Sequence, residues 1–225
     1  MICYAARMSS NAYVFRGIRG LTRLLNVFLT LGAVMALLCL VMTVSMPGLF
    51  IRGNGSEAEL LASATRQQFL DLLFGGLAVA TAITFGNWIV RANRNARALC
   101  AHGLRVSPGW AVGFFFIPLV NLWRPYQAMK DLWRASESPN DWGSVPVGAV
   151  VRNWWTLWIL HGGIGYLAMR IEIEAQLRPA KSDDLQLAPL LSMFQYALYV
   201  ALCVVSISLV SRIAKAQHSW VEDGA

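Results

Sequence analysis

Polar side chains beside long apolar runs are the first candidates for chemistry in this sequence. Arg91, Arg94 and Arg97 follow directly on an apolar run that ends at Val90. Basic residues at the end of a membrane segment attract anionic lipid at about 1 kcal/mol each. This position favours lipid contact over nucleic-acid binding, which interleaved arginines would otherwise suit. The predicted polar or lipid-contact residues are Asn87, Arg91, Arg94, Arg97, Asn121, Arg124, Arg152 and Asn153.

His161 and Gln195 form a second candidate pair, inside the apolar runs themselves. At 1.5 Å per residue, His161 lies roughly 13 Å from the outer end of its run, and Gln195 about 10 Å along the next run. A short connection joins these runs, so we expect neighbouring helices and a hydrogen bond between the two side chains. Such a pair stabilises helix packing by on the order of 1 kcal/mol. A proton relay would need further ionisable groups, which the runs do not supply.

Catalytic motifs are absent from the sequence. It contains no HExxH, no G-x-S-x-G and no Walker A run. The histidines, His102, His161 and His218, fall in separate regions without ligand spacing. No cysteine is in a CxxC pair, and Cys39 and Cys203 lie in apolar runs, so we expect buried free thiols and no disulfide framework. The sequence therefore predicts no catalytic, cofactor-binding or metal-binding residue.

The elements that position these residues are predicted to be transmembrane helices. Of the 225 residues 56% are hydrophobic and 14% charged, with a mean hydropathy of +0.49, whereas soluble domains carry about 25% charged residues. A helix needs about 20 apolar residues to cross the hydrocarbon. Four runs meet this length, 24–46, 69–90, 147–169 and 188–210, and Pro47 with Gly48 is expected to end the first. The fold class is therefore an all-α integral membrane protein with four spans.

The domain organisation follows from these runs. Residues 1–23 are predicted to be a basic cytoplasmic segment, 24–212 a single four-helix membrane domain, and 213–225 a cytoplasmic tail. The first run exceeds the 7–15 residues of a signal-peptide core and no A-x-A site follows it, so it is expected to remain as an anchor. Met8 is a candidate start, because the first helix needs nothing before it.

Lysine and arginine counts set the orientation. The N-terminus, the long central connection with the start of the third run, and the tail together hold fourteen of these residues, and the other two connections hold five. Both termini and the central connection are therefore expected in the cytoplasm.

The stretch 107–136 within the central connection is too apolar for a loop but contains Pro118 and Asn121. We expect a short apolar helix that ends near Pro118, then a helix beginning at Pro125. Tyr126, Met129 and Trp133 form one stripe of that second helix, and the other side holds Gln127, Lys130, Asp131 and Arg134. Such an amphipathic pattern is typical of a helix at the membrane interface. Asn121 is expected to cap a helix or to bond freed carbonyls.

Tryptophans are expected to hold this stretch at the level of the headgroups, where an indole can bury its ring and satisfy its N–H. Those predicted to do so are Trp110, Trp123, Trp133 and Trp142. Two interpretations stay open. The element either plugs the inner end of the helix bundle, or forms a re-entrant hairpin that lines a ligand or lipid site.

Three motifs carry a resemblance to a known family. The segments RANRNARAL, SPGWAVGFFFIP and NLWRPYQAMKDLWRAS together resemble a bacterial polytopic membrane family catalogued as a domain of unknown function, DUF4328. The resemblance covers roughly 69–212, and its most specific part is 107–133. It implies an inner-membrane protein with several spans, and it supplies no catalytic residue.

Three functions remain at this point. The leading one is a non-enzymatic inner-membrane protein that acts through membrane lipids at the cytoplasmic face, or through a protein partner or a second copy of the chain. The alternative is a small transporter or channel subunit with a polar site among Asn87, Asn121 and Asn153. An enzyme of lipid metabolism is the third. Nucleic acid is not an expected partner.

Overall fold

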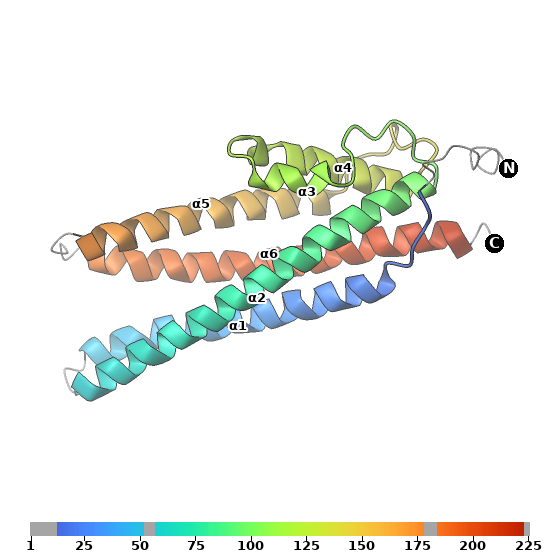
Figure 1. The fold of residues 1–225 in the computed structure, drawn as a ribbon. Coiled ribbons are helices and arrows are strands. Elements are labelled where there is room, and N and C mark those ends of the chain that lie inside the picture. The colour runs from blue at the N-terminus through green and yellow to red at the C-terminus, as the bar shows by residue number, and fades with distance from the viewer. Residues whose placement is uncertain (1–12, 52–56, 178–183, 223–225) are drawn as a thin grey trace. The chain divides into compact units, whose positions relative to one another are not determined.

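The protein is helical throughout the part of the chain that can be described. The computed structural model describes residues 13–51, 57–177 and 184–222, and these ranges contain no strand (Figure 1). The predicted all-α class is thereby confirmed. The candidate start at Met8 lies outside the described residues.

Four long helices correspond to the four predicted runs. They are α1 (Arg19–Ile51), α2 (Glu57–Ala98), α5 (Ala149–Leu177) and α6 (Asp184–Glu222). As expected, α2 continues through the basic stretch RANRNARA to Ala98. The prediction that Pro47 and Gly48 end the first helix is wrong, because α1 runs on to Ile51. A proline removes one backbone hydrogen bond but does not by itself stop a membrane helix, since other groups take up the freed carbonyl.

Three helical segments are long and apolar enough to cross a membrane within the described ranges, namely Arg19–Val44, Gln68–Ala98 and Leu190–Glu222. These segments make the chain a membrane protein. The remaining long helix, α5, has sufficient length but includes Trp154, Trp155, Trp158 and His161 together with several glycines. These residues lower its mean hydropathy, so the fourth crossing stays a prediction.

The contacts divide the chain into two compact units. Unit 1 comprises Met1–Val27, Ala82–Trp155 and Ser206–Ala225, and unit 2 comprises Phe28–Thr81 and Thr156–Val205. Unit 1 contains most of the predicted site residues, and unit 2 contains His161 and Gln195.

Aromatic packing forms the core of unit 1. Trp88 and Trp154 are fully buried, and the ring of Phe85 lies 6.2 Å from Trp88 and 6.0 Å from Trp154. The Trp88 indole N–H donates to the Thr22 hydroxyl at 2.9 Å, and that hydroxyl donates to the Ile18 carbonyl. A buried indole needs such a partner. This bond therefore ties the start of α1 to α2.

Four short elements occupy the stretch between α2 and α5. They are α3 (Trp110–Gly113), η2 (Phe114–Phe116), η3 (Val120–Leu122) and α4 (Arg124–Glu137). The first two end before Pro118, and Pro125 lies in the first turn of α4, both as expected. Asn121 does not cap α4, because the helix begins after Trp123 without a side-chain cap.

The buried face of α4 is broader than the predicted stripe. Met129 and Trp133 of the predicted stripe are buried, and Tyr126 is half-buried. Asp131, predicted on the polar side, is only 3% exposed. Leu132 is buried as well, so the helix packs a broad face on protein. Interfacial and re-entrant placement of this region remain predictions.

Gly148 offers a test of that packing. A Cβ atom there would lie 2.7 Å from Cζ2 and 2.9 Å from Cε2 of Trp133, whose rigid ring is buried. We expect Gly148→Ala to destabilise the protein by about 1–3 kcal/mol through overpacking, lowering Tm in detergent by several degrees. Gly143→Ala is the matched control, since a Cβ there meets nothing within 4 Å. Equal Tm values for the two variants would contradict this packing.

Tyr199 is the hub of unit 2. Its ring lies 5.1 Å from the ring of Phe74 and 5.3 Å from that of His161, and its hydroxyl bonds the Cys203 thiol. A Cβ on Gly32 would come within 3.0 Å of the Tyr199 hydroxyl oxygen. The small residue thus permits close approach of α1 and α6.

The predicted state of the cysteines is confirmed in part. Cys39 and Cys203 are buried free thiols. Cys100 is disulfide-bonded, so the prediction is wrong for this residue, and sequence spacing alone gave no sign of the bond.

Candidate functional site

A basic groove in unit 1 lies between the N-terminal segment with the start of α1 and the later part of α2. Its volume is about 650 Å³. Its walls combine guanidinium and amide groups with aliphatic side chains. The lining residues are Tyr13, Val14, Arg16, Leu21, Leu24, Thr84, Asn87, Val90, Arg91, Arg94 and Asn95. The groove thus brings together Asn87, Arg91 and Arg94 of the predicted set and adds Arg16.

The helical spacing explains why two of these arginines share one wall. Arg91 and Arg94 are three residues apart on α2 and therefore lie on the same face. Arg16 lines the same groove from the N-terminal segment. Among the described residues no carboxylate lies within 4.0 Å of these three guanidiniums. The groove is therefore a concentration of unneutralised positive charge.

Asn95 fixes the N-terminal wall of the groove. Its side chain is 0% exposed. Its Oδ1 accepts from the Arg16 backbone N–H at 3.0 Å, and its Nδ2 donates to the Arg16 carbonyl at 2.9 Å. The amide thereby serves both backbone groups of one residue, as a neighbouring strand would. Sequence reasoning did not include Asn95 or Arg16 among the site residues. The one sign in the sequence was that Asn95 is an amide within the arginine-rich end of α2. Its partner, the Arg16 backbone, lies 79 residues earlier and could not be inferred from that sign.

Arg97 has a different role from Arg91 and Arg94. Its guanidinium donates to the Val106 carbonyl at 2.7 Å and the Leu104 carbonyl at 3.3 Å, and to the Asn93 side chain at 3.2 Å. It also lies 5.8 Å from the ring of Tyr13. Arg97 therefore holds the loop after α2 and does not line the groove.

The remaining predicted residues lie outside this groove. Arg124 is exposed, with its guanidinium 5.7 Å from the Phe114 ring. Asn121 is half-buried in η3. Arg152 and Asn153 are exposed within the first two turns of α5. The three asparagines that a transporter site would join therefore do not share this groove.

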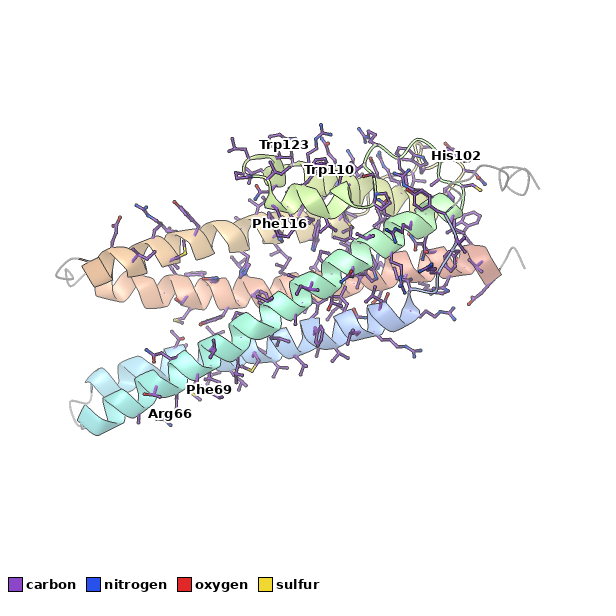
Figure 2. All side chains as sticks on the ribbon, in the orientation of Figure 1. Arg66, Phe69, His102, Trp110, Phe116 and Trp123 are labelled. Carbon is purple, nitrogen blue, oxygen red and sulfur yellow. The ribbon has the colours of Figure 1, made fainter. Side chains whose placement is uncertain are left out.

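An exposed apolar tip is the second feature of unit 1. Phe116 is 81% exposed and Leu119 72%, and Trp110, Leu122 and Trp123 are exposed as well. Trp110, Phe116 and Trp123 can be followed in Figure 2, on the segment that carries α3 and leads to α4. A cluster of large apolar side chains exposed to water is costly. We call these five residues the apolar tip.

Several backbone groups of the apolar tip are paired within its own turns. Leu119 has φ 65° and ψ −48°, and the Val120 N–H donates to the Pro118 carbonyl at 2.8 Å, which defines a strained γ-turn. The N–H groups of Asn121 and Leu122 donate to Ile117 and Leu119. Backbone that enters lipid must be paired in this way. The tip is therefore suited to an apolar surrounding.

The tryptophans predicted at headgroup level divide into two groups. Trp110 and Trp123 are exposed in the tip. Trp133 is buried within the protein, so the prediction is wrong for that residue. The Trp142 indole donates to the His102 carbonyl at 2.8 Å. Trp110, Trp123 and the half-buried Trp142 therefore have rings available to lipid.

An ion pair connects the loop after α2 to α4. Arg105 donates to both carboxylate oxygens of Asp131, at 3.1 and 2.9 Å. The hydrogen bond and the charge of Asp131 raise the pKa of Arg105 above its ordinary value. Asp131 is buried, whereas Arg105 is about half exposed. The pair explains why a carboxylate can occupy the buried face of α4.

Removing the arginine of this pair is expected to destabilise unit 1. Arg105→Ala leaves the Asp131 carboxylate buried without its partner, at a cost of about 1–3 kcal/mol. The exposure of Arg105 keeps the cost below that of a fully buried pair. Thermal unfolding in detergent measures the change, and Arg105→Ala combined with Asp131→Asn should recover most of the loss. A single variant as stable as the parent would show that the pair contributes nothing.

A buried polar chain joins α6 to α2 and α4. Gln217 is fully buried, and its Nε2 donates to the Ala92 carbonyl at 2.9 Å and the Ser136 hydroxyl at 3.0 Å. The Trp220 indole donates to the Ser136 carbonyl at 3.1 Å. These bonds pack the end of α6, within the predicted tail 213–225, against the rest of unit 1.

A second, smaller groove of about 420 Å³ lies beside this chain. It is lined by Trp133, Glu137, Arg212, Lys215, Ala216, Ser219 and Trp220. Its lining includes two basic residues and one carboxylate, so its charge is partly balanced.

His161 and Gln195 are neighbours in unit 2. A Cβ on Gly165, one turn along from His161, would lie 2.8 Å from the Nε2 atom of Gln195, and the buried Nδ1 of His161 has no hydrogen-bond partner among the described residues. The two helices therefore meet at the depth that the sequence indicated, through packing of the Gln195 side chain beside Gly165. The contact has the character of helix packing.

The fold and these features define an all-helical membrane protein with a basic groove and an apolar tip in one unit. Residues 52–215 match the family model described as Domain of unknown function (DUF4328), so the chain belongs to this family. The match covers α2 to most of α6, including the groove arginines of α2 and the apolar tip. No curated protein and no solved structure matches the chain.

Proposed function

We propose that this protein is a non-enzymatic bacterial inner-membrane protein that acts by binding anionic lipid at the cytoplasmic face. In this proposal both termini and the connection between α2 and α5 are cytoplasmic, a compartment in which the disulfide of Cys100 would be reduced. The chain crosses the membrane four times, with α5 as the third crossing. The apolar tip enters the inner leaflet from the cytoplasmic side, and the chain then returns to the cytoplasmic side.

The observation that carries the proposal is the charge of unit 1 combined with its apolar tip. Among its described residues unit 1 has thirteen arginines and lysines and only four carboxylates. A surface with this charge is attracted to anionic lipid, and exposed aromatic side chains insert beside the headgroups. The backbone bonds within the tip lower the cost of such insertion.

The groove composition favours binding over the transporter interpretation. A transporter site at Asn87, Asn121 and Asn153 needs one water-filled cavity that reaches all three. The groove reaches only Asn87. Its open position on unit 1 and its aliphatic wall suit a bound lipid.

Lipid analysis of the purified protein tests the proposal. The full chain is extracted with its surrounding membrane by a styrene–maleic acid polymer, and the retained lipids are quantified by mass spectrometry. We expect anionic phospholipid to be enriched several-fold over the bulk membrane. Retained lipid with the composition of the bulk membrane would contradict the proposal. A second protein that co-purifies in stoichiometric amount would also contradict it, and would indicate that the chain acts through a protein partner.

A further inference from the structure

We propose that the basic groove is a specific site for one anionic glycerophospholipid, whose phosphate lies among the guanidiniums of Arg16, Arg91 and Arg94. The inference rests on the proposed function and names the ligand class and the place where it binds. General attraction between unit 1 and a charged bilayer requires no such site.

The charges of the groove select a phosphate. Guanidinium groups match the geometry of phosphate oxygens and can bind them in pairs. Three guanidiniums line the groove, and none of its lining residues is acidic. The carboxylates of unit 1 in the described residues are Asp131, Glu137, Asp141 and Glu222. None of these four lines the groove, and Asp131 and Glu222 are already paired with Arg105 and Arg19, so an external anion can neutralise the charge of the groove.

The size and the aliphatic wall select a lipid over a free phosphate ion. A volume of about 650 Å³ lies in the range of small-molecule sites and far exceeds a phosphate group. Leu21, Leu24 and Val90 line the groove beside the arginines, and Leu24 is about half exposed. A glycerol backbone and the first part of an acyl chain would cover these side chains and remove apolar surface from water. An inorganic anion would leave them exposed.

Asn87 favours a headgroup that contains a hydroxyl. One N–H of its amide already donates to the Ile83 carbonyl at 3.0 Å. This bond holds the side chain in place and leaves its carbonyl oxygen as an acceptor at the groove. A glycerol headgroup supplies a hydroxyl donor, so phosphatidylglycerol is the probe of choice.

The groove is ordered before any ligand binds. Asn95 holds the backbone of Arg16 with two hydrogen bonds. Arg97 lies against the Tyr13 ring and is itself held by two carbonyls. A wall that is already ordered lowers the entropy lost on binding.

Lipid titration of the full-length protein in detergent tests the site. Dissociation constants are measured by native mass spectrometry for phosphatidylglycerol and phosphatidylcholine, with glycerol phosphate as the soluble anion. We expect phosphatidylglycerol to bind at least tenfold more tightly than phosphatidylcholine. Arg91→Gln and Arg94→Gln should each weaken phosphatidylglycerol binding roughly fivefold to tenfold, and Arg94→Lys should weaken it less.

Arg23→Gln is the matched control. Arg23 is exposed on the same stretch of α1 in unit 1 but does not line the groove, so binding should remain as in the parent. Equal weakening in Arg23→Gln and Arg94→Gln would overturn the site while leaving general lipid attraction in place. Glycerol phosphate that binds as tightly as the lipid would also overturn it. Phosphatidylglycerol that binds no better than phosphatidylcholine would contradict both the site and the proposed function.

Discussion

Replacing Asn95 with leucine is expected to release residues 13–18 from α2. The variant loses both hydrogen bonds to the Arg16 backbone and presents an apolar side chain to that backbone instead. Each such bond contributes about 1 kcal/mol, and a part-buried backbone group left without a partner costs about 1 kcal/mol more. Together these terms amount to about 3 kcal/mol, which corresponds to roughly a 100-fold change in an opening equilibrium.

Hydrogen exchange of the Arg16 amide measures this change directly, because that amide is the donor to Asn95. We expect exchange to accelerate on the order of 100-fold in Asn95→Leu. Asn93→Leu is the matched control, since Asn93 is an equally buried amide two residues away that accepts from Arg97 and not from Arg16. If both variants exchange at the parental rate, Asn95 does not hold the N-terminal wall. In Asn95→Leu the affinity for phosphatidylglycerol should fall together with the protection of the Arg16 amide from exchange.

Removing the aromatic side chains of the apolar tip is expected to withdraw the tip from the bilayer. Trp110, Phe116 and Trp123 expose roughly half or more of their surface. Full burial of a large apolar side chain stabilises by about 1.5–3 kcal/mol, so partial burial of three such side chains contributes about 3–5 kcal/mol. The triple replacement by glutamine removes most of this term. The remaining apolar residues of the tip cannot hold it in lipid alone.

An environment-sensitive fluorophore on Leu122→Cys reports the position of the tip in liposomes. We expect blue-shifted emission that nitroxide lipids quench, and a red shift with loss of quenching in the triple glutamine variant. The same fluorophore on Ser144→Cys, an exposed position in the loop before α5, should give water-like emission in both backgrounds. Emission from Leu122→Cys that is water-like in the unmodified tip would contradict insertion.

The long helices were predictable because their signal is local. A run of about 20 apolar residues in lipid has to satisfy its own backbone, and a helix does so within the segment. Hydropathy therefore located α1, α2 and α6, and it also located α5, although the tryptophans and His161 of that helix weaken its signal. The ends were less predictable, as Pro47 in α1 illustrates, because the stop depends on the surroundings of the proline.

The details of the site were less predictable because their partners are distant in sequence. Asp131 fits the polar side of an amphipathic helix until Arg105, 26 residues earlier, is placed against it. The three arginines of the RANRNARAL stretch look equivalent, yet Arg97 is turned to loop carbonyls while Arg91 and Arg94 line the groove. Helical spacing predicts which side chains share a face of the helix. It does not predict which of those side chains will bind other parts of the protein and which will stay free to line a groove.

Labelling of Ser144→Cys with a membrane-impermeant maleimide tests the central claim, that the basic unit and the apolar tip belong to the cytoplasmic side. The unmodified chain provides the background for its own cysteines. We expect the added thiol to react in inverted membrane vesicles and to stay unlabelled in intact spheroplasts until the membrane is permeabilised. Labelling in intact spheroplasts would place this loop outside the cytoplasm and contradict the account.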